Sequence, residues 1–202
     1  MFTGIVAAVG RIATVTPLGD SAAGVKLTID AGILGLDDVA LGDSIAIQGA
    51  CMTVVFATGN AFEVEVSRES LSKTAGLAAP GPVNLEKAVA LSTRLGGHLV
   101  TGHVDGLGRV LSFLPVGESR ELIVRAPREL ARFMAIKGSV TVNGVSLTVN
   151  RVTDVPDGVD LSINLIPHTI ANTTLKWLAP GAAVNLEIDL IARYVERMLA
   201  TA

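Results

Sequence analysis

The sequence lacks several features that would point to particular classes of protein. It has one cysteine, so no disulfide can form within the chain, and we expect a reducing compartment, the cytoplasm. Its 16 basic and 19 acidic residues leave a formal charge of -3, which argues against a nucleic-acid surface. Its apolar runs are short and interrupted by glycine and charge, so we expect no membrane span, and the repeat described below begins so early that we expect no signal peptide.

Motifs for metals and phosphates are also missing. The three histidines and the cysteine show no metal-ligand spacing, and neither a G-x-G-x-x-G nor a Walker pattern occurs. Aromatic residues make up 3% of the chain while hydrophobic residues make up 50%, so the apolar mass is aliphatic. Because valine and isoleucine favour strands, this composition predicts cores built from β-structure, without a metal site.

The sequence contains one segment that occurs twice in similar form. Residues 42–54 read GDSIAIQGACMTV and residues 137–149 read KGSVTVNGVSLTV, and TGIV at residues 3–6 returns as TGHV at residues 101–104. A long repeat present twice predicts two homologous domains rather than a solenoid. Short strands between Gly/Pro turns predict a small closed barrel in each half. We therefore predict an all-β fold.

The predicted boundaries follow the repeat. An N-terminal barrel is expected over residues 1–97, a C-terminal barrel over 98–189, and a helix over 190–202. A short helix is expected within 67–74 and a helical turn within 86–98. The strands expected in the first half lie at residues 2–15, 25–29, 44–47, 52–57, 61–66 and 83–85.

The C-terminal segment, LIARYVERMLATA, has no counterpart in the first half. It places Ile191, Val195, Met198 and Leu199 on one face of a helix. The pattern leaves open whether this face packs on its own barrel or on a partner chain.

Two small polar side chains, Cys51 and Ser146, occupy the same position in the two copies. A lone cysteine or serine is most often buried or bonded to backbone. Here both lie in a Gly-x-(Cys/Ser)-x-Thr frame, and Thr53 and Thr148 are expected to point to the same face two residues further on. The matched frames favour a pair of equivalent polar pockets.

The histidines differ in their expected roles. We interpret His103 as functional, because it replaces Ile5 of the first copy and histidine transfers protons near neutral pH. We interpret His98, which follows two glycines, as a structural residue bonded to backbone. His168, after Pro167, is expected in a loop that contacts a ligand.

Charged candidates are fewer. Lys137 is aligned with Leu41 of the first copy, an asymmetry expected if the two halves play different parts. Glu65 and Asp189 are expected at strand ends, where most carboxylates are structural.

Several ordered motifs resemble one family, the α-type riboflavin synthases, along the whole chain. The motifs are MFTGIV, GACMTV, GGHLVTGHVDG, KGSVTVNGVSLTVN, IPHTIANTTL and VNLEIDLIARYVERM. The resemblance implies two six-stranded Greek-key β-barrels, each binding one 6,7-dimethyl-8-ribityllumazine, and a homotrimer formed through C-terminal helices. It implies a transferase without cofactor or metal, whose active site lies between the N-barrel of one subunit and the C-barrel of its neighbour. Lumazine synthase is a candidate partner.

The resemblance also implies the site residues. The N-barrel pocket would use Gly4, Ile5, Val6, Cys51, Met52, Thr53, Glu65, Val66, Ser67, Arg68, Glu69 and Ser70. The C-barrel pocket would use Gly102, His103, Val104, Ser146, Leu147, Thr148, Asn164, Leu165, Ile166, Pro167, His168 and Thr169. The catalytic candidates are Ser146, His103, Cys51, Thr148, Lys137 and Asp189, of which Lys137 would reach a lumazine held by a neighbouring N-barrel.

Two alternatives stay open. A lumazine-binding protein without turnover, like the fluorescent antenna paralogs, would share the fold, but the two intact frames favour the enzyme. An unrelated β-barrel binding module would lack the ordered motifs. The sequence departs from the family pattern mildly, at Gln48, Ala50 and Met52, where Asn, Val and Leu are usual.

Overall fold

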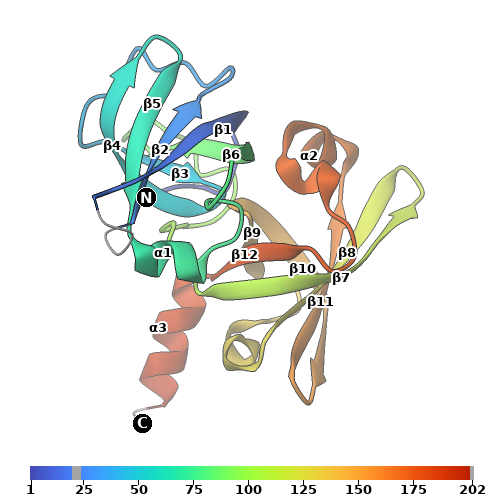
Figure 1. The fold of residues 1–202 in the computed structure, drawn as a ribbon. Coiled ribbons are helices and arrows are strands. Elements are labelled where there is room, and N and C mark those ends of the chain that lie inside the picture. Colours follow the sequence, from blue (N-terminus) through green and yellow to red (C-terminus); the bar gives the residue numbers. More distant parts are fainter. Residues whose placement is uncertain (20–23, 201–202) are drawn as a thin grey trace.

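Two strand-rich lobes and a terminal helix make up the computed structural model, which describes residues 1–19 and 24–200 (Figure 1). In the first lobe the strands close into a barrel in the order β1-β2-β5-β4-β3-β6, with every pair antiparallel. The strands are β1 (Ala8–Pro17), β2 (Val25–Asp30), β3 (Ser44–Ile47), β4 (Ala50–Thr58), β5 (Ala61–Val66) and β6 (Gly81–Lys87).

The second lobe repeats this topology, because its circle β7-β8-β11-β10-β9-β12 has the same neighbours in the same sequence. Its strands are β7 (Gly106–Val116), β8 (Ser119–Pro127), β9 (Ser139–Val142), β10 (Val145–Val155), β11 (Gly158–Leu165) and β12 (Ala183–Ile188). The helical segments are α1 (Arg68–Lys73), η1 (Arg128–Phe133), α2 (Pro167–Asn172), η2 (Thr174–Trp177) and α3 (Leu190–Leu199). The predicted pair of six-stranded barrels is confirmed.

Side-chain alternation along β4 explains where a site can lie. Ala50, Met52 and Val54 are buried, whereas Cys51 and Thr53 lie on the opposite face of the strand. The same alternation runs along β10. The aliphatic residues thus fill each barrel, and the polar residues of the duplicated frames face away from the barrel cores.

Backbone irregularities are duplicated as well. A register shift between Ile12 and Thr14 of β1 returns between Val110 and Ser112 of β7, and the shift in β4 returns in β10. Bulges bend a strand and increase its twist, which helps a small sheet close on itself.

The first segment of the chain corrects one prediction. The strand expected from residue 2 begins at Ala8, and the preceding segment leaves its own barrel. Phe2 pairs with Val100 in an isolated antiparallel bridge, with Phe2 N donating to Val100 O at 2.8 Å. The helical turn expected within residues 86–98 is also wrong, since that linker has turns but no helix.

The two barrels touch at their β3–β4 and β9–β10 turns. A Cβ atom at Gly49 would lie 2.6 Å from the Gly144 nitrogen, so only glycine allows the two turns to meet. Beside this contact, Asn84 Nδ2 donates to Asn143 O at 2.9 Å, and Asn185 Nδ2 donates to Gln48 O at 2.9 Å. The interface therefore has approximate two-fold symmetry.

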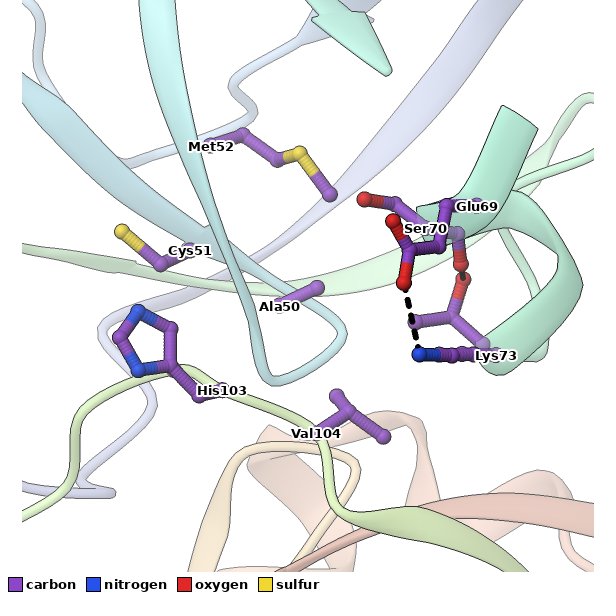
Figure 2. A pocket seen from close by; sticks show the side chains of 10 residues that line it. Ala50, Cys51, Met52, Glu69, Ser70, Lys73, His103 and Val104 are labelled. Carbon is purple, nitrogen blue, oxygen red and sulfur yellow. Dashed lines mark hydrogen bonds and ion pairs between the residues drawn. The ribbon is translucent and has the colours of Figure 1, made fainter. Parts of the chain in front are cut away.

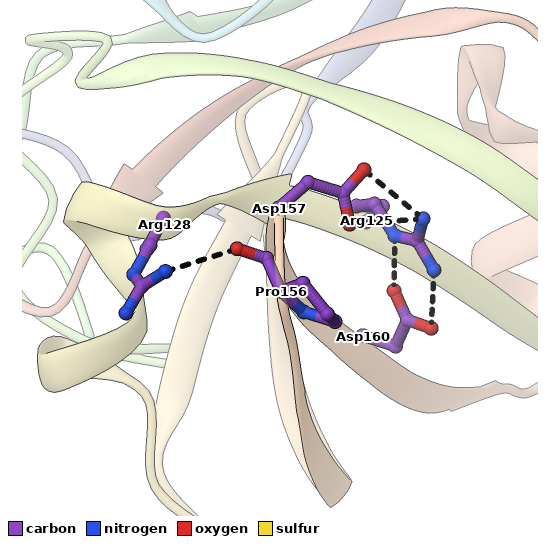
Figure 3. A network of polar contacts seen from close by, with 5 residues as sticks. All are labelled: Arg125, Arg128, Pro156, Asp157 and Asp160. Atoms are coloured by element: carbon purple, nitrogen blue, oxygen red, sulfur yellow. Dashed lines mark hydrogen bonds and ion pairs between the residues drawn. The ribbon is translucent and has the colours of Figure 1, made fainter.

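The solvent-facing end of the C-barrel carries a separate polar network (Figure 3). Arg125 makes a two-pronged contact with Asp160, Nε to Oδ1 at 2.7 Å and Nη2 to Oδ2 at 3.0 Å, which joins β8 to β11. Arg128 donates to the Pro156 carbonyl at 3.0 Å. None of these residues was expected in a pocket, and the contacts pin the β10–β11 turn.

The predicted C-terminal helix is confirmed as α3, and residues 201–202 lie outside the described chain. Arg193 pairs with Asp105 and Arg132 pairs with Glu196, which attach the helix to the C-barrel. Its apolar residues remain exposed: Ile191, Tyr194, Val195, Met198 and Leu199. Within the described ranges, no helix is long and apolar enough to cross a membrane.

Candidate functional site

The segments that precede the two barrels exchange places. Ser146 N, on β10, donates to the Gly4 carbonyl at 2.7 Å, and Cys51 N, on β4, donates to the Gly102 carbonyl at 2.8 Å. Residues 4–6 therefore lie against the C-barrel frame and residues 102–104 against the N-barrel frame. The expected grouping, in which each barrel keeps its own segment, is wrong, because the segments pair with each other at the interface before crossing.

Each crossing point requires a glycine. Gly4 has φ +74° and Gly102 has φ +76°, in the left-handed region that favours glycine. A Cβ atom would lie 2.6 Å from Ser146 Cβ at Gly4, and 2.7 Å from Cys51 Cβ at Gly102. The backbone thus passes directly over the paired polar residues.

A buried carboxylate bonds each of the two segments that cross to the opposite barrel, residues 3–6 and 101–104, which we call the crossing segments. Glu86 accepts hydrogen bonds from Thr3 N at 2.7 Å, Thr3 Oγ1 at 2.7 Å and Gly4 N at 3.0 Å. Glu187 accepts from Thr101 N at 2.7 Å, Thr101 Oγ1 at 2.7 Å and Gly102 N at 2.9 Å. Burial raises the pKa of both carboxyl groups above the usual glutamate value, although these hydrogen bonds act in the opposite direction. Neither glutamate was among the predicted site residues.

The N-barrel pocket is a cavity of about 200 Å³ between β4, α1 and the crossing segment 102–104. Figure 2 shows Cys51 and His103 at one end and the Glu69–Lys73 ion pair at the other, with Nζ and Oε1 2.7 Å apart. The lining residues are Ala50, Cys51, Met52, Glu69, Ser70, Lys73, Thr74, Gly102, His103 and Val104. His103 therefore belongs to the N-barrel pocket, and Ala50, Lys73 and Thr74 are additions to the expected set.

A different histidine accompanies Ser146. His98 Nδ1 lies 2.8 Å from Ser146 Oγ, and the residue is 9% exposed. Its Nε2 is buried without a hydrogen-bond partner among the described residues. Burial lowers the pKa of His98, and the negative charge of Asp189 offsets part of this effect. A neutral imidazole can accept the Ser146 proton or donate its own, so the pair can relay a proton.

The interpretation of His98 as a structural residue bonded to backbone is thus incomplete. Its main-chain N donates to Thr3 O at 3.1 Å, but the ring bonds the predicted catalytic serine. The signal was the glycine pair before it, because a Cβ at Gly97 would lie 2.7 Å from Ser146 Cβ. The missing side chain at Gly97 allows the backbone to bring the imidazole against the C-barrel frame.

A second cavity, of about 430 Å³, lies between the start of β1 and α2. It joins Val6, expected in the N-barrel pocket, with His168, expected in the C-barrel pocket, as the crossing requires. Its lining residues are Val6, Ala7, Ala8, Val9, Gly32, Ile33, His168, Ala171, Asn172 and Lys176.

Two other catalytic candidates bond to groups other than Ser146, although Asp189 lies near enough for its charge to oppose the lowering of the His98 pKa by burial. Asp189 caps α3 by accepting from Ile191 N at 2.9 Å, and Lys137 Nζ donates to Asn150 Oδ1 at 3.1 Å. The structural equivalent of Lys137 is Gly42 rather than Leu41. Both have positive φ, and their amides bond Val149 and Val54 in the same way.

Some predicted binding residues point into the cores instead of a pocket. Val66 and Leu165 are each 1% exposed, and Leu147 is also buried. Thr53 and Thr148 are exposed on the outer strand faces, as expected. The other predicted residues border α1 and α2 on the surface: Glu65, Ser67, Arg68, Asn164, Ile166, Pro167 and Thr169. Over residues 1–19 and 24–200, no three His, Cys, Asp or Glu side chains are grouped to hold a metal.

Comparison with known proteins matches this duplicated architecture. The model of the lumazine binding domain matches twice, at residues 3–88 and 101–189. A riboflavin synthase of Mycobacterium tuberculosis (strain ATCC 25618 / H37Rv) is 42% identical over 206 residues, covering 100% of both chains. The riboflavin synthase of Photobacterium phosphoreum is also 42% identical, over 98% of this chain and 89% of that protein.

A solved structure of LumP with riboflavin has the same fold, with a TM-score of 0.79 and 24% identity, over 93% of this chain and 99% of that one. LumP with 6,7-dimethyl-8-(1'-D-ribityl) lumazine gives a TM-score of 0.77 at 23% identity, over the same shares. Both likenesses concern the fold, whereas the sequence matches identify the relatives. The chain belongs to the riboflavin synthase family and carries its lumazine-binding domain twice.

Proposed function

We propose that the chain is an enzyme that dismutates two molecules of 6,7-dimethyl-8-ribityllumazine. A four-carbon unit moves from one lumazine to the other, and the products are riboflavin and 5-amino-6-(D-ribitylamino)uracil. The observation that carries this proposal is a pair of equivalent outer-face frames with unequal polar groups, Cys51 with His103 and Ser146 with His98. Two like substrates need two like pockets, and a donor and an acceptor need different chemistry.

The proposed division of labour follows these groups. In the C-barrel, Ser146 backed by His98 serves proton transfer at the acidic methyl group of a bound lumazine, since the imidazole is kept neutral by burial. In the N-barrel, His103 and Cys51 serve the ring of the second lumazine. Holding two rings in register supplies much of the acceleration, because it replaces a bimolecular encounter with a prearranged one.

The proposed active site joins the N-barrel of one subunit to the C-barrel of its neighbour in a homotrimer. The uncovered apolar face of α3 supports this assembly, because a contiguous exposed apolar surface marks an interaction site. Val195→Asp is expected to shift the particle to monomer mass in light scattering, and an unchanged mass would refute the role of α3. Association with lumazine synthase and a cytoplasmic location rest on the family resemblance and on the single cysteine.

Incubation with 6,7-dimethyl-8-ribityllumazine tests the activity directly, by the absorbance of riboflavin. Conversion is the expected result. A stable complex without conversion would favour the alternative, a lumazine-binding protein without turnover, and absence of binding would refute both. Ser146→Ala and His103→Ala, made singly, are expected to slow turnover, and full activity in both variants would refute the residue assignment.

A further inference from the structure

We propose that Glu86 and Glu187 are crossed positioning residues, each of which fixes the pocket wall of the opposite barrel. Glu187 lies on β12 of the C-barrel yet sets the wall of the N-barrel pocket. Glu86 lies on β6 of the N-barrel yet sets the segment over Ser146. The ligand class of these pockets rests on the proposed function, but the positioning role can be tested without ligand.

A continuous series of hydrogen bonds connects Glu187 to the N-barrel pocket. Its carboxylate is buried, and its two oxygens accept three hydrogen bonds from Thr101 and Gly102. Gly102 in turn contacts the N-barrel, because its carbonyl accepts a hydrogen bond from Cys51 N at 2.8 Å. The next residue, His103, lines the pocket, so its place depends on where Gly102 is held.

An equivalent series of hydrogen bonds connects Glu86 to Ser146. Its carboxylate accepts from Thr3 and Gly4, and the Gly4 carbonyl then accepts from Ser146 N at 2.7 Å. Thr3 O also accepts from the main-chain N of His98, so the same segment orders the residue whose ring meets Ser146. Glu86 therefore acts on the C-barrel pair without touching it.

Between their anchors, each crossing segment makes a single backbone bond to a strand of the opposite barrel, Gly4 O with Ser146 N or Gly102 O with Cys51 N. Each is fixed at its far end by one backbone bond, Ala7 N to Leu85 O or Asp105 N to Leu186 O. In between, the carboxylate supplies the bonds to the Thr-Gly pair. A glutamine has one acceptor oxygen, which can keep the two threonine bonds, but its NH2 group would then face the glycine N–H, so it cannot keep all three bonds.

The single cysteine makes the N-barrel wall measurable. Cys51 lines the pocket under Gly102, so its reaction rate with 5,5′-dithiobis(2-nitrobenzoate) reports how firmly that wall is held. In the full chain, Glu187→Gln is expected to raise the rate severalfold. Glu86→Gln, the matched control, is expected to leave it near that of the unsubstituted protein. An unchanged rate in Glu187→Gln, or an equal rise in both variants, would overturn the proposal.

Moving the thiol provides the reciprocal test. In a Cys51→Ser, Ser146→Cys background, the pattern should reverse, so that Glu86→Gln raises the rate and Glu187→Gln does not. If a glutamine variant fails to fold, Thr101→Val and Thr3→Val remove one carboxylate bond each and should show the same crossed pattern. Failure of lumazine turnover in the unsubstituted chain would refute the proposed function but leave the thiol pattern intact.

Discussion

The two barrels share their backbone architecture but differ in the side chains that they place at the pockets. Strand order, bulges and the buried carboxylate with its Thr-Gly partner are all repeated. The differences lie on outer faces and crossing segments: Cys51 against Ser146, and His103 against Ile5. Since the core sets stability and the outer face sets chemistry, a duplicated fold can diverge in function while keeping its packing.

The contact between the barrels should be the most sensitive position. Gly144→Ala is expected to lower the free energy of unfolding by about 3 kcal/mol, because the new Cβ meets the backbone of Gly49 at 2.8 Å and φ is positive. Gly59→Ala is the matched control, with positive φ and open space, and should cost about 1 kcal/mol. Urea unfolding measures both, and equal losses would mean that the turns need not meet.

The paired polar residues should differ in their effect on turnover. Ser146→Ala is expected to reduce kcat about a hundredfold, because it removes the hydroxyl bonded to His98. Cys51→Ala should reduce kcat by about tenfold or less, since no hydrogen bond to its thiol is found over the described ranges. Steady-state kinetics with 6,7-dimethyl-8-ribityllumazine measure kcat for both variants. Equal reductions in kcat would contradict the unequal roles of the two barrels.

A pH dependence should appear on the C-barrel side. The pKa of folded His98 is lowered, so unfolding takes up a proton between that lowered pKa and the ordinary histidine value of about 6.5. This contribution to stability is present at higher pH and lost as the pH falls through that window, by up to about 1.4 kcal/mol per pH unit. His98→Gln should lack it. The free energy of unfolding is measured for both proteins at pH 7.5 and pH 5. Because both proteins retain Glu86 and Glu187, the change with pH in the difference between them reports His98 alone. A difference that stays constant between the two pH values would refute this prediction.

The smallest effect is expected at the ion pairs that join the C-barrel to α3, which follows only the second copy of the repeat. Glu196→Gln removes the exposed pair with Arg132 and should cost about 0.5 kcal/mol or less. Arg193→Gln removes the pair with the more buried Asp105 and should cost about 1 kcal/mol. Thermal unfolding compares them, and a larger loss for Glu196→Gln would reverse this ranking.

The fold was predictable because its signals are local. The strands expected at residues 44–47 and 61–66 are those observed, since alternation and turn residues lie within the same short stretch. The first strand was predicted six residues too early, at residue 2 instead of Ala8. An extended segment that crosses to another barrel has the same β-branched composition as a strand.

Candidate residues for the site could be proposed from the sequence, but their grouping in space could not. Aligning the copies brought out Cys51 and Ser146. The family resemblance assigned each crossing segment to its own barrel, because likeness in sequence carries no information on which surface a segment contacts. Lys137 was also matched with Leu41, although residues 42–54 and 137–149, taken end to end, pair it with Gly42, and the positive φ of both residues confirms that pairing. The contact of His98 with Ser146 joins residues far apart in sequence, which no periodicity reveals.

Subunit complementation tests most directly whether two unequal barrels of neighbouring chains form one active site. Cys51→Trp blocks the N-barrel pocket, Ser146→Trp blocks the C-barrel frame, and each variant alone should be inactive. Refolded together in equal amounts, they should recover about a quarter of the unsubstituted activity. In a closed ring with random order, half of the intact N-barrels then face an intact C-barrel. A mixture as inactive as its parents would show that both pockets must belong to the same chain.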